Sequence, residues 1–79
     1  MKGFVIYLST EPEVNFIGNN YGYWTGKTYQ REDVIYPGWE DDKEDENVKI
    51  YKNKKRAESM SEKMRERFTF VRSSRVEEI

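Results

Sequence analysis

Residues 53–68 read NKKRAESMSEKMRERF and form the most regular segment of this 79-residue chain. Its apolar side chains recur at spacings of three and four, the period of a helix with a single apolar stripe. They are Ala57, Met60, Met64 and either Arg67 or Phe68. Asn53 is a suitable N-cap, because its side-chain oxygen can accept a free backbone N–H. The segment therefore predicts an amphipathic helix over residues 54–67 that packs through one face.

Short apolar and aromatic runs on both sides of this helix predict strands. They are residues 4–8; 14–17 and 21–25, joined as a hairpin through Gly18-Asn19-Asn20; 34–36, stopped by Pro37-Gly38; 48–51; and 68–71, continued by 76–79 after an interruption at 72–75. The first run is apolar on both faces, which favours a central strand. The order predicts one α+β domain over residues 1–79, a small antiparallel sheet of about four strands with the helix of the C-terminal half on one face.

Composition limits what this domain can do. Hydrophobic residues make up 35% of the chain and charged residues 37%, so a folded core has to draw on the four Phe, two Trp and six Tyr. The chain has no cysteine for disulfides, no apolar run long enough to span a membrane, and a start that is too short and too soon polar for a signal peptide. These features predict a cytoplasmic protein without membrane contact.

The chain also lacks histidine, so the commonest general base, the commonest metal ligand and the thiolate nucleophile are all missing. No phosphate-binding glycine loop or serine nucleophile motif is present, and no two of the fifteen acidic residues stand out as a catalytic pair. We therefore expect no enzyme activity, no cofactor, and no catalytic or metal-ligating residues.

Charge is divided unevenly along the chain. Residues 1–46 carry four basic and ten acidic side chains, a net charge of −6, whereas residues 47–79 carry ten basic and five acidic side chains, a net charge of +5. The two halves can attract each other across the fold, or they can serve two partners of opposite sign. The most acidic run, within residues 39–47, predicts an extended, solvated and flexible loop.

This loop and the neighbouring aromatic residues suggest a protein-binding site. Spaced carboxylates can occupy a basic groove of a partner, and Tyr and Trp are enriched at interface hot spots. The residues predicted to contact a partner are Tyr23, Trp24, Trp39, Glu40, Asp41, Asp42, Glu44, Asp45 and Glu46. A loop that is merely solvated accounts for the same carboxylates. Core packing likewise accounts for the aromatic set Tyr21, Tyr23, Trp24, Tyr29, Tyr36 and Trp39, with one or two members exposed.

Two other functions are compatible with the sequence. Nucleic acid could contact the basic start of the helix, at Lys52, Lys54, Lys55 and Arg56, although a sequence pI of about 5.5 is low for a nucleic-acid-binding domain. Self-association, for instance as a homodimer, could use residues 76–79 as an open pairing edge.

The segment VKIYKNKKRAE at residues 48–58, with the following SMSEKM and the opening MKGFVIYL, resembles small proteins of phages and prophages from low-GC Gram-positive bacteria. In those proteins a strand leads into a charged helix and a short strand ends the chain. The resemblance covers about the last 32 residues and the opening segment. It implies an accessory protein that binds host or phage macromolecules, and it assigns no functional residue.

Overall fold

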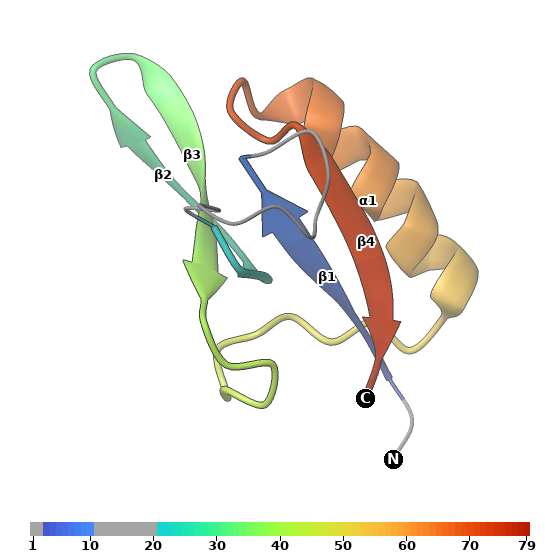
Figure 1. The fold of residues 1–79 in the computed structure, drawn as a ribbon. Helices are drawn as coiled ribbons and strands as arrows, with labels where there is room; N and C mark the ends of the chain where they lie inside the picture. The colour runs from blue at the N-terminus through green and yellow to red at the C-terminus, as the bar shows by residue number, and fades with distance from the viewer. Residues whose placement is uncertain (1–2, 11–20) are drawn as a thin grey trace.

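The computed structural model describes residues 3–10 and 21–79 as a four-stranded antiparallel sheet with one helix. The elements are β1 (Phe4–Ser9), β2 (Tyr23–Arg31), β3 (Val34–Glu40), α1 (Lys54–Arg67) and β4 (Ser73–Glu78). The strand order is β3-β2-β1-β4, and Figure 1 shows α1 lying across one face beside β1 and β4. The α+β fold and the central position of the first strand are therefore confirmed. No helix in the described residues is long and apolar enough to cross a membrane.

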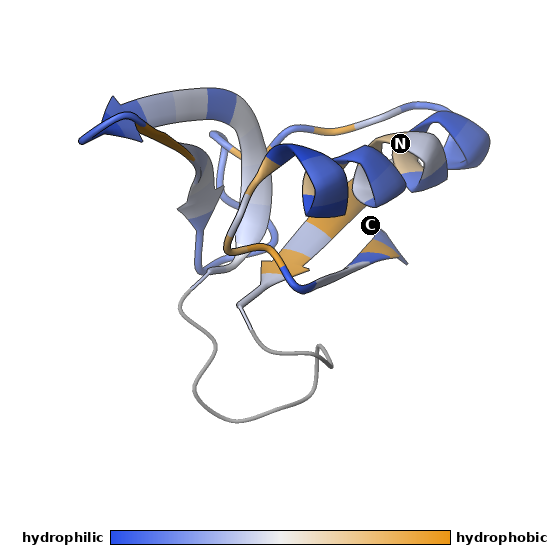
Figure 2. Cartoon of the chain, turned by 90° about the horizontal axis from the view of Figure 1, so that it is seen from above, coloured by the Kyte–Doolittle hydropathy of each residue, from blue (hydrophilic) through white to orange (hydrophobic). Residues whose placement is uncertain are grey.

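Helix α1 has the bounds that its sequence predicts. The Asn53 side chain caps it by accepting hydrogen bonds from the backbone N–H groups of Lys55 and Arg56, at 2.9 and 3.3 Å. Its buried residues are Ala57, Ser61 and Met64, with Phe68 following at the C-cap. Figure 2 shows the helix as mostly hydrophilic, whereas β1 beside it is hydrophobic. The packing of one helical face therefore fixes α1 on the sheet.

Strands β2 and β3 form a hairpin whose turn is at Glu32 and Asp33. Both residues have positive φ, 50° and 68°, which is the backbone of a turn that matches the twist of a hairpin. The prediction that Pro37-Gly38 stops the strand is wrong, since β3 continues through both residues to Glu40. β3 is an edge strand, and an edge position tolerates a proline because its missing N–H need not bond to a neighbouring strand. The first arm of the hairpin predicted at 14–25 lies outside the described residues.

Two other predicted strands are corrected by the structure. Residues 48–51 form an isolated bridge and no strand: the backbones of Phe4 and Tyr51 exchange two hydrogen bonds of 2.8 Å, and the Lys49 N–H donates to the Trp24 carbonyl. Residues 68–71 form a turn after α1, closed by a hydrogen bond from the Val71 N–H to the Phe68 carbonyl. The last strand begins at Ser73, so residues 72–75 do not interrupt it. In each segment two apolar residues three positions apart are buried, Val48 with Tyr51 and Phe68 with Val71, without a strand being formed.

The acidic loop predicted within residues 39–47 begins at residue 41, because Trp39 and Glu40 end β3, and it is folded into turns and not extended. The carboxylate of Asp42 accepts a hydrogen bond from the Glu44 N–H, and that of Asp45 accepts one from the Asn47 N–H, at 2.9 and 2.8 Å. The carbonyls of the same two aspartates accept further backbone hydrogen bonds. Short aspartate side chains commonly organise turns in this way, and here they shape a segment whose charges alone favour extension. Its flexibility stays a prediction.

Candidate functional site

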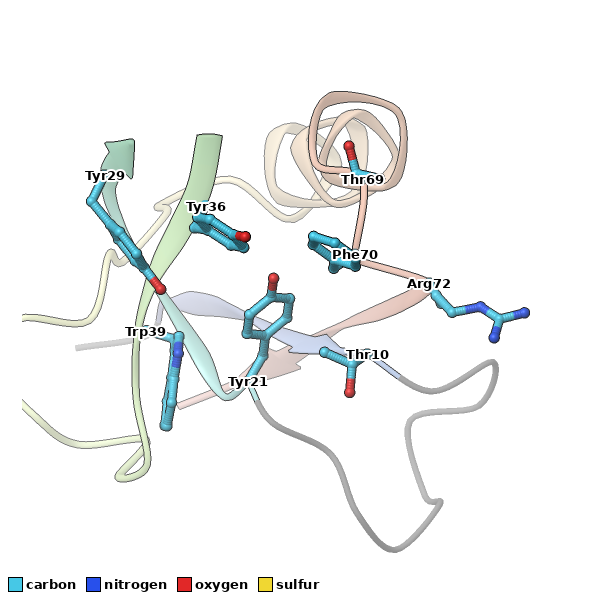
Figure 3. Close-up of a pocket in the computed structure, with 8 residues that line it drawn as sticks. All are labelled: Thr10, Tyr21, Tyr29, Tyr36, Trp39, Thr69, Phe70 and Arg72. Atoms are coloured by element: carbon cyan, nitrogen blue, oxygen red, sulfur yellow. The ribbon is translucent and has the colours of Figure 1, made fainter. Parts of the chain in front are cut away.

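A hollow lined by aromatic side chains lies between the β2–β3 hairpin and the connection from α1 to β4. It has a volume of about 500 Å³. We call it the aromatic groove. It is lined by Tyr21, Tyr29, Tyr36, Trp39, Phe70 and Arg72, with Thr10 and Thr69 beside Arg72 and Phe70 (Figure 3).

Three of these rings form a continuous stack. The ring centroids of Tyr29 and Tyr36 are 5.3 Å apart with an interplanar angle of 19°, and those of Tyr36 and Phe70 are 5.8 Å apart with an angle of 6°. Tyr29 and Phe70, at the two ends of the stack, are each 48% exposed. The stack thus leaves a large aromatic surface in contact with water, although the chain has few apolar residues.

The shape of the hairpin produces this stack. β2 pairs with β1 only at Tyr23, and its register with β3 shifts between Trp24 and Thr28, where Gly26 has a φ of +83°. A bulge with a glycine in this conformation bends a strand and increases its twist. Beyond the bend Tyr29 pairs directly with Tyr36, and Tyr36 meets Phe70. The second half of the hairpin therefore leaves the sheet and forms one wall of the groove.

The groove presents polar hydrogens within an apolar lining. In the part of the chain that the structure describes, the hydroxyls of Tyr29 and Tyr36 and the indole N–H of Trp39 make no hydrogen bond, and the Arg72 guanidinium has no carboxylate partner. Burial, together with the nearby hydroxyls of Tyr29 and Tyr36, raises the pKa of Tyr21. Tyr21 thus stays protonated at neutral pH, and within residues 3–10 and 21–79 no carboxylate lines the groove.

The aromatic residues predicted to contact a partner are separated by the fold. Trp24 is only 3% exposed, packs against Phe68, and donates its indole N–H to the Tyr51 hydroxyl at 3.1 Å. It is a core residue, and we leave it out of any contact surface. Tyr23 is half-buried and donates its hydroxyl to Glu77 at 3.1 Å. Of the three, only Trp39 reaches the groove.

The acidic residues lie at the other end of the sheet from the α1–β4 connection. Figure 1 shows the loop after β3 at the bottom and the α1–β4 connection at the top. Asp41, Asp42, Glu44 and Glu46 are exposed, whereas Glu40 and Asp45 are partly buried. None of the six has a basic partner within 4 Å among residues 3–10 and 21–79. The loop therefore carries a concentrated negative charge.

Glu77 anchors this loop to the sheet. Its carboxylate lies 3.2 Å from the Lys43 amine and 2.7 Å from Nε of Arg75, and it accepts the Tyr23 hydroxyl. Burial works against ionisation of Glu77, but the hydrogen bonds from Arg75, Lys43 and Tyr23 outweigh it and hold its pKa below the ordinary value. The charge of Glu77 therefore stabilises the folded protein.

Replacing Glu77 with glutamine is expected to lower the unfolding free energy by about 1–3 kcal/mol at pH 7, because Arg75 and Lys43 lose a negatively charged acceptor and one of its two oxygens becomes a donor. A lowered pKa contributes stability that is present above the unfolded value, about 4.5, and is lost as the pH falls through the folded value. Urea unfolding between about pH 3 and pH 7 should therefore bring the variant and the original protein together in acid. Glu78→Gln, at an exposed position that has no ion pair with any described residue, is the control and should change stability by less than about 0.5 kcal/mol. A constant difference across the pH range would contradict this role.

The residues of the nucleic-acid hypothesis are all exposed at the start of α1. Lys52 and Arg56 share a hollow of about 320 Å³ with Lys49, whereas Lys54 lines a different hollow together with Glu58 and Glu62. Asn53 already accepts two of the N–H groups at this helix end. The basic side chains are therefore divided between two surfaces, and one of these surfaces includes carboxylates. β4 is an edge strand of the sheet. Self-association through this strand stays a prediction.

Sequence reasoning did not single out the groove. The sequence includes Tyr29 and Tyr36 in the aromatic set but not among the predicted contact residues, and it predicts Phe70 within a strand. Tyr29 and Tyr36 are equally far from the turn at Glu32-Asp33, one before it and one after it. This symmetry is a signal that could have paired them. Nothing local in the sequence could have brought Phe70 to them.

Comparisons of the chain with models of known protein families, with curated proteins and with solved structures find no match. The resemblance to phage and prophage proteins thus stays a prediction, and the function has to be argued from the site alone.

Proposed function

We propose that the protein is a small protein-binding module and that its contact surface is the aromatic groove. The observation that carries this proposal is the half-exposed stack of Tyr29, Tyr36 and Phe70. Contiguous exposed apolar surface is uncommon on monomeric proteins and often marks an interaction site. Tyr and Trp also supply large contact area at a small cost in side-chain entropy.

The acidic loop favours a partner that carries basic residues. Its carboxylates are without basic partners in the described part of the chain, so their field extends into solvent. Such a field speeds encounter with a partner of opposite charge, and salt weakens it. In this proposal the groove supplies affinity and the loop supplies attraction at longer range.

Selection from a library of random peptides tests the proposed function. We expect the protein to retain a set of peptides that the double variant Tyr29→Ala/Phe70→Ala does not retain, because truncating two ring contacts at a hot spot weakens binding at least about tenfold. Ile35→Ala is the matched control, since Ile35 lies on the same hairpin, is 47% exposed and does not line the groove. Circular dichroism checks that each variant is folded.

A charge variant tests the contribution of the loop. Asp41→Asn, Glu44→Gln and Glu46→Gln remove three exposed carboxylates and leave in place Asp42 and Asp45, which form the turns. Retained basic peptides should bind this variant more slowly at low salt. A single-stranded oligonucleotide is tested in parallel. If it binds, if alanine at Lys52, Lys54, Lys55 and Arg56 abolishes this binding, and if no peptide is retained, the protein-binding proposal is wrong.

A further inference from the structure

The groove has an unusual hydrogen-bonding character, because its unpaired polar groups favour ligands that accept hydrogen bonds. Trp39 and Arg72 can only donate, and the hydroxyls of Tyr29 and Tyr36 have protons without an acceptor in the described residues. Among the described residues that line the groove there is no Asp or Glu. A ligand rich in carbonyl groups would find several donors here, whereas a ligand that brings N–H or O–H donors would find only hydroxyl oxygens as side-chain acceptors among the described residues.

A proline-rich peptide has this chemistry. Proline has no backbone N–H, so each proline brings only a carbonyl acceptor to an interface. In the polyproline II conformation these carbonyls make no internal hydrogen bonds and point outward. Such a segment is also largely ordered before it binds, so less conformational entropy is lost on docking.

The aromatic surface fits the same ligand. Flat rings of Tyr, Trp and Phe provide apolar surface for pyrrolidine rings, and grooves lined by such residues are a recurring way to hold polyproline II segments. The successive centroid spacings of 5.3 and 5.8 Å make the stack comparable in length to one turn of polyproline II, about 9 Å. The stack can therefore contact a full turn of the ligand.

We propose that the aromatic groove binds a proline-rich segment in the polyproline II conformation. This inference rests on the proposed protein-binding function and names its partner class. A stacked nucleic-acid base is the principal rival. Of the groove-lining side chains in the part of the chain that the structure describes, only Arg72 is charged, whereas binding of a single strand combines stacking with several phosphate contacts. The lining therefore favours the peptide.

Titration calorimetry of the complete chain with a synthetic proline-rich peptide of about ten residues tests the inference. A glycine–serine peptide of the same length is the control ligand. We expect the proline peptide to bind and the control to bind at least about tenfold more weakly. Tyr29→Ala/Phe70→Ala should weaken proline-peptide binding at least about tenfold, and Ile35→Ala should leave it unchanged.

Two conservative variants separate hydrogen bonding from ring contact. Tyr36→Phe and Trp39→Phe keep an aromatic ring and remove the donor. Each is expected to weaken the proline peptide about threefold to tenfold, the effect of losing one hydrogen bond. Unchanged affinity in both variants would remove the donor argument and overturn the inference.

The library selection distinguishes failure of this inference from failure of the proposed function. Retained peptides that are enriched in proline, and whose retention depends on Tyr29 and Phe70, support both the partner class and the protein-binding function. Peptides that depend on the same two residues but lack proline overturn the partner class and keep the protein-binding function. If no peptide binds, and the oligonucleotide binds the original protein but not Tyr29→Ala/Phe70→Ala, both are overturned.

Discussion

Replacing Phe68 with alanine is expected to lower the unfolding free energy by about 3–5 kcal/mol, the usual cost of deleting a buried aromatic ring. Phe68 is 1% exposed, its ring centroid lies 5.6 Å from that of Trp24, and its N–H caps α1 by donating to the Met64 carbonyl. Small domains have only about 0.05–0.15 kcal/mol of stability per residue. The loss would therefore take a large share of the total, and thermal unfolding followed by circular dichroism would show a much lower Tm.

Phe70→Ala is the matched control for this variant, because it deletes the same ring two positions later. Phe70 is half exposed and stacks only on Tyr36 among the described aromatic residues, so its loss should cost about 0.5–1.5 kcal/mol. The pair also separates stability from function. Phe70→Ala should weaken peptide binding in a protein that is still folded. Similar Tm values for the two variants would contradict the assignment of Phe68 to the core and of Phe70 to the groove.

The helix was predictable from the sequence because everything that defines it is local. The cap at Asn53 and the apolar stripe through Ala57 and Met64 lie within one segment, and the observed bounds agree. Ser61 was missed because its burial depends on another element. Its hydroxyl lies 2.6 Å from that of Ser74 on β4, and the Ser74 hydroxyl also donates to the Ser61 carbonyl. A polar residue in an apolar stripe gives no signal of such a partner.

The hairpin and the groove were not predictable, because their causes are non-local or run against local propensity. The turn uses Glu32 and Asp33 at positive φ, where a glycine or asparagine is the usual signal, while Pro37-Gly38 lies inside a strand. Gly38 is required there by close packing, since a side-chain carbon would lie 2.9 Å from the Lys27 carbonyl oxygen. The groove in turn needs the bend of this hairpin toward Phe70, which no short window of sequence contains.

Gly22→Ala is expected to lower the unfolding free energy by about 1–3 kcal/mol and to weaken binding in the groove. A carbon added at Gly22 would lie 2.5 Å from the Glu40 carbonyl oxygen and 3.0 Å from Cε3 of Trp39. The first contact is with backbone, and it can be relieved only by opening the pairing of Tyr23 with Glu40 at the base of the hairpin. The Gly22 carbonyl also accepts the Leu8 N–H at 2.8 Å, close to the single point where β2 joins β1.

Gly3→Ala is the control that separates this effect from glycine replacement in general. Gly3 is also buried, and its added carbon would lie 2.5 Å from Ile50, but the contact is the end of a side chain that is 51% exposed and can rotate away. We expect it to cost less than about 1 kcal/mol and to leave binding unchanged. Urea unfolding and peptide titration measure both effects. Equal losses for the two variants would mean that the base of the hairpin is not a rigid junction. If only Gly22→Ala weakens binding, the position of Trp39 in the groove depends on the close approach of β2 and β3 at that residue.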